Sequence, residues 1–197
     1  MYVCIIMEGQ QFRSSKNWLN FFEKEDRPIK YLEVGVHYGR NLFEVATETF
    51  ATHPESELHC IDPWEDYEEY PEYIGKQESI YETFQKNLKK LPEADAKKIT
   101  IHRGYSRDLI PAFADDSFDL IYIDGNHEPE YCLEDGVLAW RKLKPGGYLI
   151  FDDFGPDPIT PTAGIRAFAT GYQKVGEFVK GGVFDGQVCI KKRVPIH

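Results

Sequence analysis

The sequence YLEVGVHYGR, residues 31–40, decides the fold of this chain. It predicts an apolar strand that runs into a turn, and the turn leads into a helix over residues 41–49. Two glycines of the turn, Gly35 and Gly39, allow backbone conformations that other residues avoid. Such a turn at the carboxyl end of a parallel strand brings ligand atoms close to the main chain. We therefore expect residues 31–45 to hold a small nucleoside-containing cofactor.

Beyond this stretch, strands and helices alternate along the chain. Apolar runs predict five strands, at residues 29–36, 57–61, 98–102, 118–123 and 148–151. Apolar residues at helical spacing predict helices over residues 79–91 and 130–143. Because the strands lack a regular polar alternation, we expect a parallel arrangement covered on both faces by helices. Two last strands flank a Gly-rich stretch and predict an antiparallel hairpin, at residues 175–179 and 188–192.

These elements predict a Rossmann-like, doubly wound α/β fold with a mostly parallel, seven-stranded sheet that ends in the C-terminal antiparallel hairpin. Residues 29–197 form the expected domain, and residues 1–28 form an N-terminal helical segment. Within that segment, a stretch over residues 15–24 is amphipathic, with an apolar side made of Trp18, Leu19, Phe21 and Phe22. We expect this helix to pack on the edge or the mouth of the main domain.

Composition narrows the classes of function. The chain has 197 residues, a formal net charge of −10 and a pI near 5.1, whereas proteins that bind nucleic acid are usually basic. Its four cysteines form no CxxC pair, which argues against a zinc site and a disulfide framework. The apolar run at residues 2–7 is too short for a signal peptide or a membrane span. We expect a cytoplasmic enzyme that acts on neither nucleic acid nor membrane.

Four residues in or after the first three strands extend the predicted cofactor site. Glu33 lies in a buried strand, where a carboxylate needs a partner, and a cationic ligand group would be one. Asp62 ends the second strand, where doubly wound folds place an acid that accepts hydrogen bonds from ribose hydroxyls. Trp64 either stacks on an adenine or covers the core. Ser106 either caps the next helix or contacts a cofactor base.

A second group of polar residues follows the fourth and fifth strands. Asp124 ends the fourth strand, and Asp152 and Asp153 end the fifth, so neighbouring parallel strands would bring them to one crevice. Three carboxylates repel one another unless a cation is present, and oxygen ligands of this kind suit Mg²⁺ or a similar divalent ion. His127 follows Asp124 by three residues, within reach for a general base.

At these residues the chain resembles the class I S-adenosylmethionine-dependent methyltransferases. More narrowly, it is similar to the metal-dependent O-methyltransferases that include the macrocin-type enzymes of antibiotic biosynthesis. The resemblance spans residues 29–192. The motifs that carry it are matched by Glu33 with Gly35 and Gly39, by Asp62, by Asp124 with Gly125 and His127, and by Asp152 and Asp153 after Lys144-Pro145-Gly146-Gly147. His37 departs from the glycine that is more common in the first motif.

The resemblance implies O-methylation of a small-molecule hydroxyl, with S-adenosylmethionine as methyl donor. It implies a divalent metal, with Mg²⁺ as the expected ion, at Asp124, Asp152 and Asp153, and His127 and Asp124 as catalytic residues. With the reasoning above, the expected cofactor contacts are Glu33, Gly35, Gly39, Asp62, Trp64, Ser106 and Asp124. Relatives are often oligomeric, which leaves a homo-oligomer open here.

The residues also leave other functions open. One is a metal-independent small-molecule methyltransferase, and another is a methyltransferase-like module that binds without turnover. A nicotinamide-dependent oxidoreductase is a further alternative, although the missing third glycine and the terminal hairpin count against it. Tyr67, Tyr70 and Tyr73, in an acidic stretch that could form a loop over the site, suit a sugar, a phenol or a polyketide-like acceptor equally well.

Overall fold

The computed structural model describes residues 7–9, 27–47, 51–67, 71–155, 161–184 and 186–195, with no side chains described for residues 180–184. The predicted helix over residues 15–24, with Trp18 and Phe22, lies outside these ranges, as does Tyr70. In the part that is described, no helix is both long and apolar enough to pass through a membrane.

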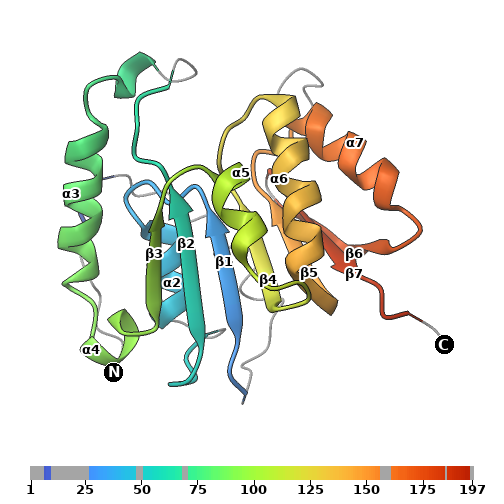
Figure 1. The fold of residues 1–197 in the computed structure, drawn as a ribbon, viewed down its shortest axis with the longest axis horizontal. Helices are drawn as coiled ribbons and strands as arrows, with labels where there is room; N and C mark the ends of the chain where they lie inside the picture. The colour runs from blue at the N-terminus through green and yellow to red at the C-terminus, as the bar shows by residue number, and fades with distance from the viewer. Residues whose placement is uncertain are drawn as a thin grey trace.

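A single sheet of seven strands organises the described chain, in the order β3-β2-β1-β4-β5-β7-β6 (Figure 1). Strands β1 to β5 run parallel, and β7 pairs in antiparallel fashion with β5 and β6. The predicted mostly parallel sheet with a terminal hairpin is thereby confirmed. The strands are β1 (Lys30–Val34), β2 (Glu57–Asp62), β3 (Ile99–Arg103), β4 (Phe118–Ile123), β5 (Leu143–Phe151), β6 (Gly176–Phe184) and β7 (Gln187–Lys192).

Helices cover both faces of the sheet, as predicted. In the view of Figure 1, α5, α6 and α7 lie on the near face and α2 lies on the far face. The α-helices are α2 (Arg40–Thr47), α3 (Gln77–Leu88), α4 (Glu93–Ala96), α5 (Ser106–Leu109), α6 (Pro129–Lys142) and α7 (Thr162–Tyr172), and two short 3-10 helices are η1 (Pro71–Tyr73) and η2 (Ile110–Ala112).

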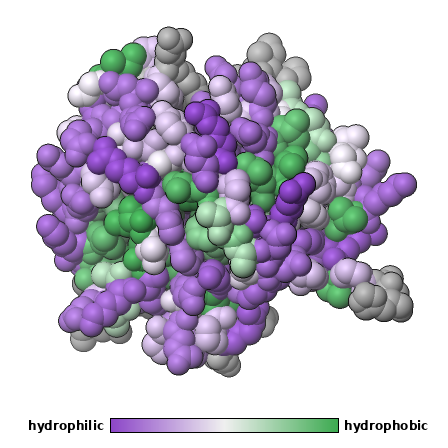
Figure 2. All heavy atoms as spheres, viewed as in Figure 1, coloured by the Kyte–Doolittle hydropathy of each residue, from purple (hydrophilic) through white to green (hydrophobic). Residues whose placement is uncertain are grey.

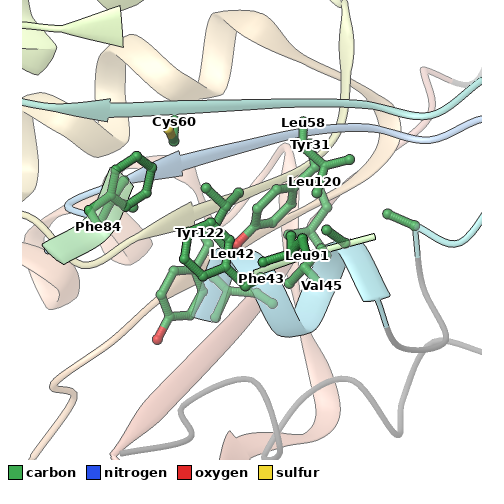
Figure 3. Packing of buried hydrophobic residues seen from close by; sticks show 14 of the residues in the cluster. Tyr31, Leu42, Phe43, Val45, Leu58, Cys60, Phe84, Leu91, Leu120 and Tyr122 are labelled. Carbon is green, nitrogen blue, oxygen red and sulfur yellow. The ribbon is translucent and has the colours of Figure 1, made fainter. Parts of the chain in front are cut away.

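Two apolar cores, one on each face, explain why the strands read as continuous apolar runs. Successive residues of a strand point to opposite faces, so Tyr31 enters the core on the α2 side and Leu32 the core on the α6 side. On the α2 side, Tyr31 packs in one cluster with Phe43 and Phe84 (Figure 3). Burial of one such aromatic side chain stabilises the fold by about 1.5–3 kcal/mol.

The sequence did not predict α7. This helix follows a Pro-rich stretch and contains Gly164 and Gly171, both poor helix formers. It is held by tertiary packing, because Ile165 and Phe168 are fully buried in the core on the α6 side. Gly164 serves that packing, since a Cβ there would lie 2.1 Å from the carbonyl oxygen of Pro129 in α6.

The sheet order reverses direction between β1 and β4. The chain moves outward from β1 to β2 and β3, then returns to the other side of β1 with β4 and β5. Such a switch point opens a crevice at the carboxyl ends of the strands, which lie at the upper edge of the sheet in Figure 1. The predicted site residues follow these strand ends.

Candidate active site

The turn after β1 is shaped by two glycines in the left-handed region. Gly35 has a φ of +82° and Gly39 a φ of +84°, values that other residues rarely adopt. A Cβ on Gly35 would lie 1.8 Å from the carbonyl oxygen of Asp124, and one on Gly39 would lie 2.4 Å from the Phe43 ring. Both glycines are therefore required by the path and the packing of the chain. Gly35 lines the cleft described below, whereas Gly39 does not.

Asp62 holds this turn in place from the end of β2. Its carboxylate accepts hydrogen bonds from the backbone amides of Val36 (2.8 Å), His37 (2.9 Å) and Trp64 (2.8 Å). Burial raises the pKa of Asp62, although the three amides favour the charged form. The sequence predicts Asp62 at the cofactor, and this bracing of the turn is an additional role that only the structure reveals.

The hydrogen-bond partners of Glu33 are two side chains of the protein itself. It is 1% exposed, and its Oε2 accepts hydrogen bonds from the Tyr31 hydroxyl (2.7 Å) and from Nδ2 of Asn41 (2.8 Å). Burial raises the pKa of Glu33 to about 8. Tyr31 and Asn41 therefore provide partners from within the protein, and a contact between Glu33 and a cationic ligand group stays a prediction.

Two buried polar atoms near the turn have no hydrogen-bond partner among the described residues. They are Oδ1 of Asn41 and Nε2 of His37, and both residues line the cleft. Burial lowers the pKa of His37 to about 4, so its ring is neutral at physiological pH. Unsatisfied buried polar atoms are rare in proteins, and their gathering beside the turn indicates that a ligand completes them.

The structure corrects the prediction that Trp64 stacks on an adenine. Its side chain is 2% exposed and does not line the cleft. The ring lies in the core against Tyr81 and Phe84, at centroid distances of 4.7 and 5.0 Å. Its Nε1 donates to the carbonyl oxygen of His37 at 3.0 Å, so Trp64 supports the turn from below.

Ser106 does not cap α5, which corrects that prediction. It is the first residue of the helix, and Tyr105 occupies the N-cap position without a side-chain hydrogen bond. Ser106 lines the cleft and bonds the carboxyl group of Asp135, whose pKa burial raises to about 7. A contact between Ser106 and a cofactor stays a prediction.

Three of the late polar residues converge. Asp124, His127 and Asp153 each offer one ligand atom, and these atoms lie within 4.8 Å of one another. Nε2 of His127 is 3.0 Å from Oδ2 of Asp153 and 3.8 Å from Oδ1 of Asp124. Two carboxylate oxygens and an imidazole nitrogen form a donor set that suits a divalent cation.

Burial and the neighbouring carboxylates together determine the pKa values of Asp124 and His127. Burial, followed by the charges of Asp152 and Asp153, raises the pKa of Asp124 to about 7. Burial alone would lower the pKa of His127, but its contacts with Asp124 and Asp153 outweigh burial and raise it to about 10. The His127 imidazolium thus offsets part of the charge of the carboxylates.

Asp152 is turned to a different set of partners. One carboxylate oxygen accepts a hydrogen bond from the Tyr122 hydroxyl, and the other accepts the backbone amide of Asp153 at 2.9 Å. Of the predicted carboxylate trio, the structure thus brings Asp124 and Asp153 together with His127. Asp152 lies beside this group, and its role as a metal ligand stays a prediction.

A cleft of about 790 Å³ joins the two halves of the site. Glu33, Gly35 and Asp62 line one part, and the group of Asp124, His127 and Asp153 lines the other. The edge that carries it is at the top of Figure 2, where the surface is indented between the α3 side and the α6 side. Five tyrosines also line the cleft: Tyr38, Tyr67, Tyr73, Tyr105 and Tyr131.

Several residues of the cleft were not predicted from the sequence, and Asn41 and Gln187 are two of them. The sequence predicts Asn41 only as the start of a helix. Gln187 begins β7 and is 1% exposed. A signal existed, because Gln187 is a polar residue two positions before Cys189, and alternation along a strand places both side chains on the same buried face.

Comparison with known families and proteins gives a consistent result. A family model described as a methyltransferase domain matches residues 32–154. One curated relative, uncharacterized protein R132 of Acanthamoeba polyphaga mimivirus, is 27% identical over 146 residues, which is 73% of this chain and 58% of that protein. The chain thus spans little more than half the length of this relative.

Solved structures share the fold. The O-methyltransferase TomG from Streptomyces achromogenes, in complex with SAM, has a TM-score of 0.56 and 20% identity over 84% of this chain and 73% of its own. The O-methyltransferase from Bacillus cereus, in complex with SAH, has a TM-score of 0.53 and 17% identity over 83% of this chain and 74% of its own. At these identities the likeness establishes a common architecture.

Proposed function

The chain belongs to the methyltransferase-domain family, and from that membership we propose that it transfers the methyl group of S-adenosylmethionine to a hydroxyl of a small-molecule acceptor. The observation that carries the proposal is the single cleft that joins the β1 turn to the group of Asp124, His127 and Asp153. A methyl donor and an acceptor can then lie side by side, and holding two reactants in contact accounts for much of the rate of such enzymes.

The residues of the β1 turn fit S-adenosylmethionine. Among the described residues, the buried polar atoms Oδ1 of Asn41 and Nε2 of His37 lack partners, and the Glu33 carboxyl group lies in the same part of the cleft. These groups would hold the ammonium end of the cofactor, while a remaining lone pair of the Asp62 carboxylate would accept a ribose hydroxyl. When bound, the cofactor supplies an electrophilic methyl group and leaves as S-adenosylhomocysteine.

The group of Asp124, His127 and Asp153 fits a divalent metal ion. Its donor atoms converge, and its two carboxylates carry the charge that a cation would neutralise. A metal ion there would lower the pKa of an acceptor hydroxyl. With both carboxylates unneutralised, His127 has a pKa of about 10 and holds a proton. Its Nε2 lone pair becomes free at neutral pH only once their charge is balanced, and it can then serve either the metal ion or a proton from the acceptor, but not both.

Binding of S-adenosylhomocysteine tests the proposal first. Titration calorimetry of the whole chain is expected to show binding, and its absence at millimolar concentration would contradict the proposed function. Transfer of a tritiated methyl group with and without a chelator then separates the metal-assisted enzyme from a metal-independent one. Binding without any transfer to hydroxyl acceptors would favour a non-catalytic module. A cytoplasmic location and a homo-oligomeric state stay predictions from the sequence.

A further inference from the structure

Residues 7–9, near the start of the chain, are attached to helix α3 through the side chain of Asn87. Oδ1 of Asn87 accepts a hydrogen bond from the backbone amide of Glu8 at 2.9 Å, and Nδ2 donates to the carbonyl oxygen of Glu8 at 2.9 Å. The side-chain amide thus pairs with the main chain of Glu8 in both directions, as a residue of a neighbouring strand would. Asn87 is 0% exposed, so bulk water does not compete for these bonds. The attachment therefore depends on the main chain of residue 8 and not on its side chain.

The same side chain also bonds the turn after β1. Nδ2 of Asn87 carries a second N–H group, and it donates to the carbonyl oxygen of Tyr38 at 3.2 Å. Tyr38 lies between Gly35 and Gly39 in the turn and lines the cleft. One buried amide of α3 thus joins residues 7–9 to the turn that would hold the cofactor.

Gly9 makes a second contact with the turn, because it packs against the ring of Tyr38. A Cβ on Gly9 would lie 2.5 Å from Cγ of that ring, and Gly9 has a φ of +89°. The Tyr38 ring in turn meets the ring of His37 edge-on, at a centroid distance of 4.2 Å. His37 lines the cleft, and its Nε2 lacks a hydrogen-bond partner among the described residues. A line of contacts therefore runs from Gly9 through Tyr38 to His37.

The turn is held on two sides. Asp62 and Trp64 bond its main chain from the end of β2. Asn87 and residues 7–9 hold it from α3, and Met7 is anchored in the core on the α2 side, where it is 7% exposed. A three-residue segment that belongs to no strand can detach locally while the sheet stays folded. The shape of the turn on this side therefore depends on whether residues 7–9 are docked.

We propose that Asn87 is a positioning residue for the cofactor. By docking residues 7–9 against Tyr38, it sets the turn and the His37 ring for S-adenosylmethionine, so that docking and cofactor binding stabilise each other. Because coupling between two binding events is reciprocal, each must strengthen the other by the same factor. The proposal rests on the proposed function, since it needs the cofactor at the β1 turn. It goes beyond that function by making a segment outside the sheet and the cleft lining part of the cofactor site.

Calorimetry with S-adenosylhomocysteine on the full chain tests the first half of this coupling. Asn87→Ala removes the three hydrogen bonds of the amide. Gly9→Ala pushes residues 7–9 away from the Tyr38 ring while Asn87 and the core stay intact. Each variant is expected to bind S-adenosylhomocysteine about fivefold or more weakly than the wild type. Gly9→Ala decides alone if loss of the buried amide leaves Asn87→Ala too unstable to measure.

Two control variants separate docking from other effects of these substitutions. Glu8→Ala removes the exposed ion pair with Lys90, of 2.8 Å, but keeps the main chain that Asn87 holds. Gly75→Ala places alanine at a φ of +73° with open space around the Cβ position, so it adds backbone strain without a clash. The affinity for S-adenosylhomocysteine should be unchanged in both.

Hydrogen exchange of the Glu8 amide tests the reciprocal half. In the wild type, saturation with S-adenosylhomocysteine should slow this exchange about fivefold or more, because the ligand favours the docked segment. The gain should be absent in Gly9→Ala. The Arg193 amide is the internal control, since it bonds the carbonyl oxygen of Val175 at 2.7 Å outside the cleft and should not respond. A merely structural role of Asn87 would lower stability but would change neither the affinity nor the response of the Glu8 amide.

The outcomes distinguish this inference from the proposed function. Absence of S-adenosylhomocysteine binding by the wild type would overturn both together. If the wild type binds, either of two results overturns the inference alone. One is an unchanged affinity for S-adenosylhomocysteine in Gly9→Ala, and the other is a Glu8 amide whose exchange does not respond to the ligand.

Discussion

Gly35 and Asp124 touch across β1 and β4, so closely that the carbonyl oxygen of Asp124 lies 1.8 Å from where a Cβ on Gly35 would be. The contact joins the turn that would hold the methyl donor to the strand end that would hold the acceptor. A hydrogen bond from the Asp124 amide to the carbonyl of Val34, at 2.8 Å, fixes the same junction. Any side chain at position 35 would therefore move one half of the site relative to the other.

Replacing Gly35 with alanine is expected to be strongly destabilising. The change combines a positive φ with a clash against main-chain atoms, which cannot rotate away as a side chain would. We expect the free energy of unfolding in urea to fall by about 2–5 kcal/mol, with loss of S-adenosylhomocysteine binding. Gly75→Ala is the matched control, because Gly75 has a φ of +73° and open space around its Cβ position. Gly75→Ala should lower the free energy of unfolding by about 1–2 kcal/mol. An equal loss in both variants would show that the close contact between Gly35 and Asp124 is unimportant for stability.

Asp62→Ala should affect the shape of the cofactor turn as well as any contact with a ribose. Three backbone amides lose a charged acceptor, and two of them belong to the turn. We expect a loss of about 2–4 kcal/mol in the free energy of unfolding and at least a tenfold weaker binding of S-adenosylhomocysteine. Asp66→Ala is the control, because it removes an exposed carboxylate that bonds the amide of Gly75. The free energy of unfolding and the affinity for S-adenosylhomocysteine should both change little in this variant. Stability unchanged in Asp62→Ala would contradict the bracing role.

The strands could be predicted from the sequence because both faces of the sheet are buried. Residues 118–123 are apolar except for Asp119, and they form β4 with the predicted bounds. What the sequence could not provide is the direction of individual side chains at the strand ends. Trp64 follows β2 as a stacking residue would, yet its φ of +45° turns the ring under the turn, against residues of α3. That direction depends on packing with a helix far along the chain.

In the candidate site, too, the strand ends could be predicted from the sequence, whereas the directions of their side chains could not. Strand order brought Asp124 and Asp153 together as expected, because parallel strands end at one edge. Asp152 differs from its neighbour because strand alternation points it to the other face, where the Tyr122 hydroxyl meets it. The partners of Glu33 were also hidden in the sequence, since Asn41 reaches it only after the chain has turned through Gly35 and Gly39.

Metal binding can be measured without any acceptor. Mn²⁺ binding, followed by the loss of its electron paramagnetic resonance signal, should weaken at least tenfold in Asp124→Asn and in Asp153→Asn, because each change removes a charged ligand. Asp116→Asn is the control, since that exposed carboxylate pairs with Lys192 away from the cleft. Weaker Mn²⁺ binding in Asp152→Asn would favour the carboxylate trio predicted from the sequence. Unchanged binding would favour the group with His127. Undiminished Mn²⁺ binding in both Asp124→Asn and Asp153→Asn would exclude a metal site here.

The buried Glu33 should make stability depend on pH. Burial raises its pKa from 4.5 to about 8, so between these values the folded protein binds a proton that the unfolded chain has released. Because the folded state binds more protons, the contribution of Glu33 to stability falls as the pH rises through this window. Below pH 4.5 the carboxyl group is neutral in both the folded and the unfolded state, so Glu33 no longer makes stability depend on pH.

Glu33→Gln isolates this contribution. The amide keeps the shape of the neutral acid but does not titrate, while the other groups of the site titrate in both proteins. We expect the free energy of unfolding of the wild type, relative to Glu33→Gln, to decline steadily between pH 5 and pH 8 in urea titrations without ligand. Parallel curves would mean that Tyr31 and Asn41 hold the charged carboxylate as well as water does. If so, Glu33 would keep its full charge at neutral pH, ready for a cationic end of the cofactor.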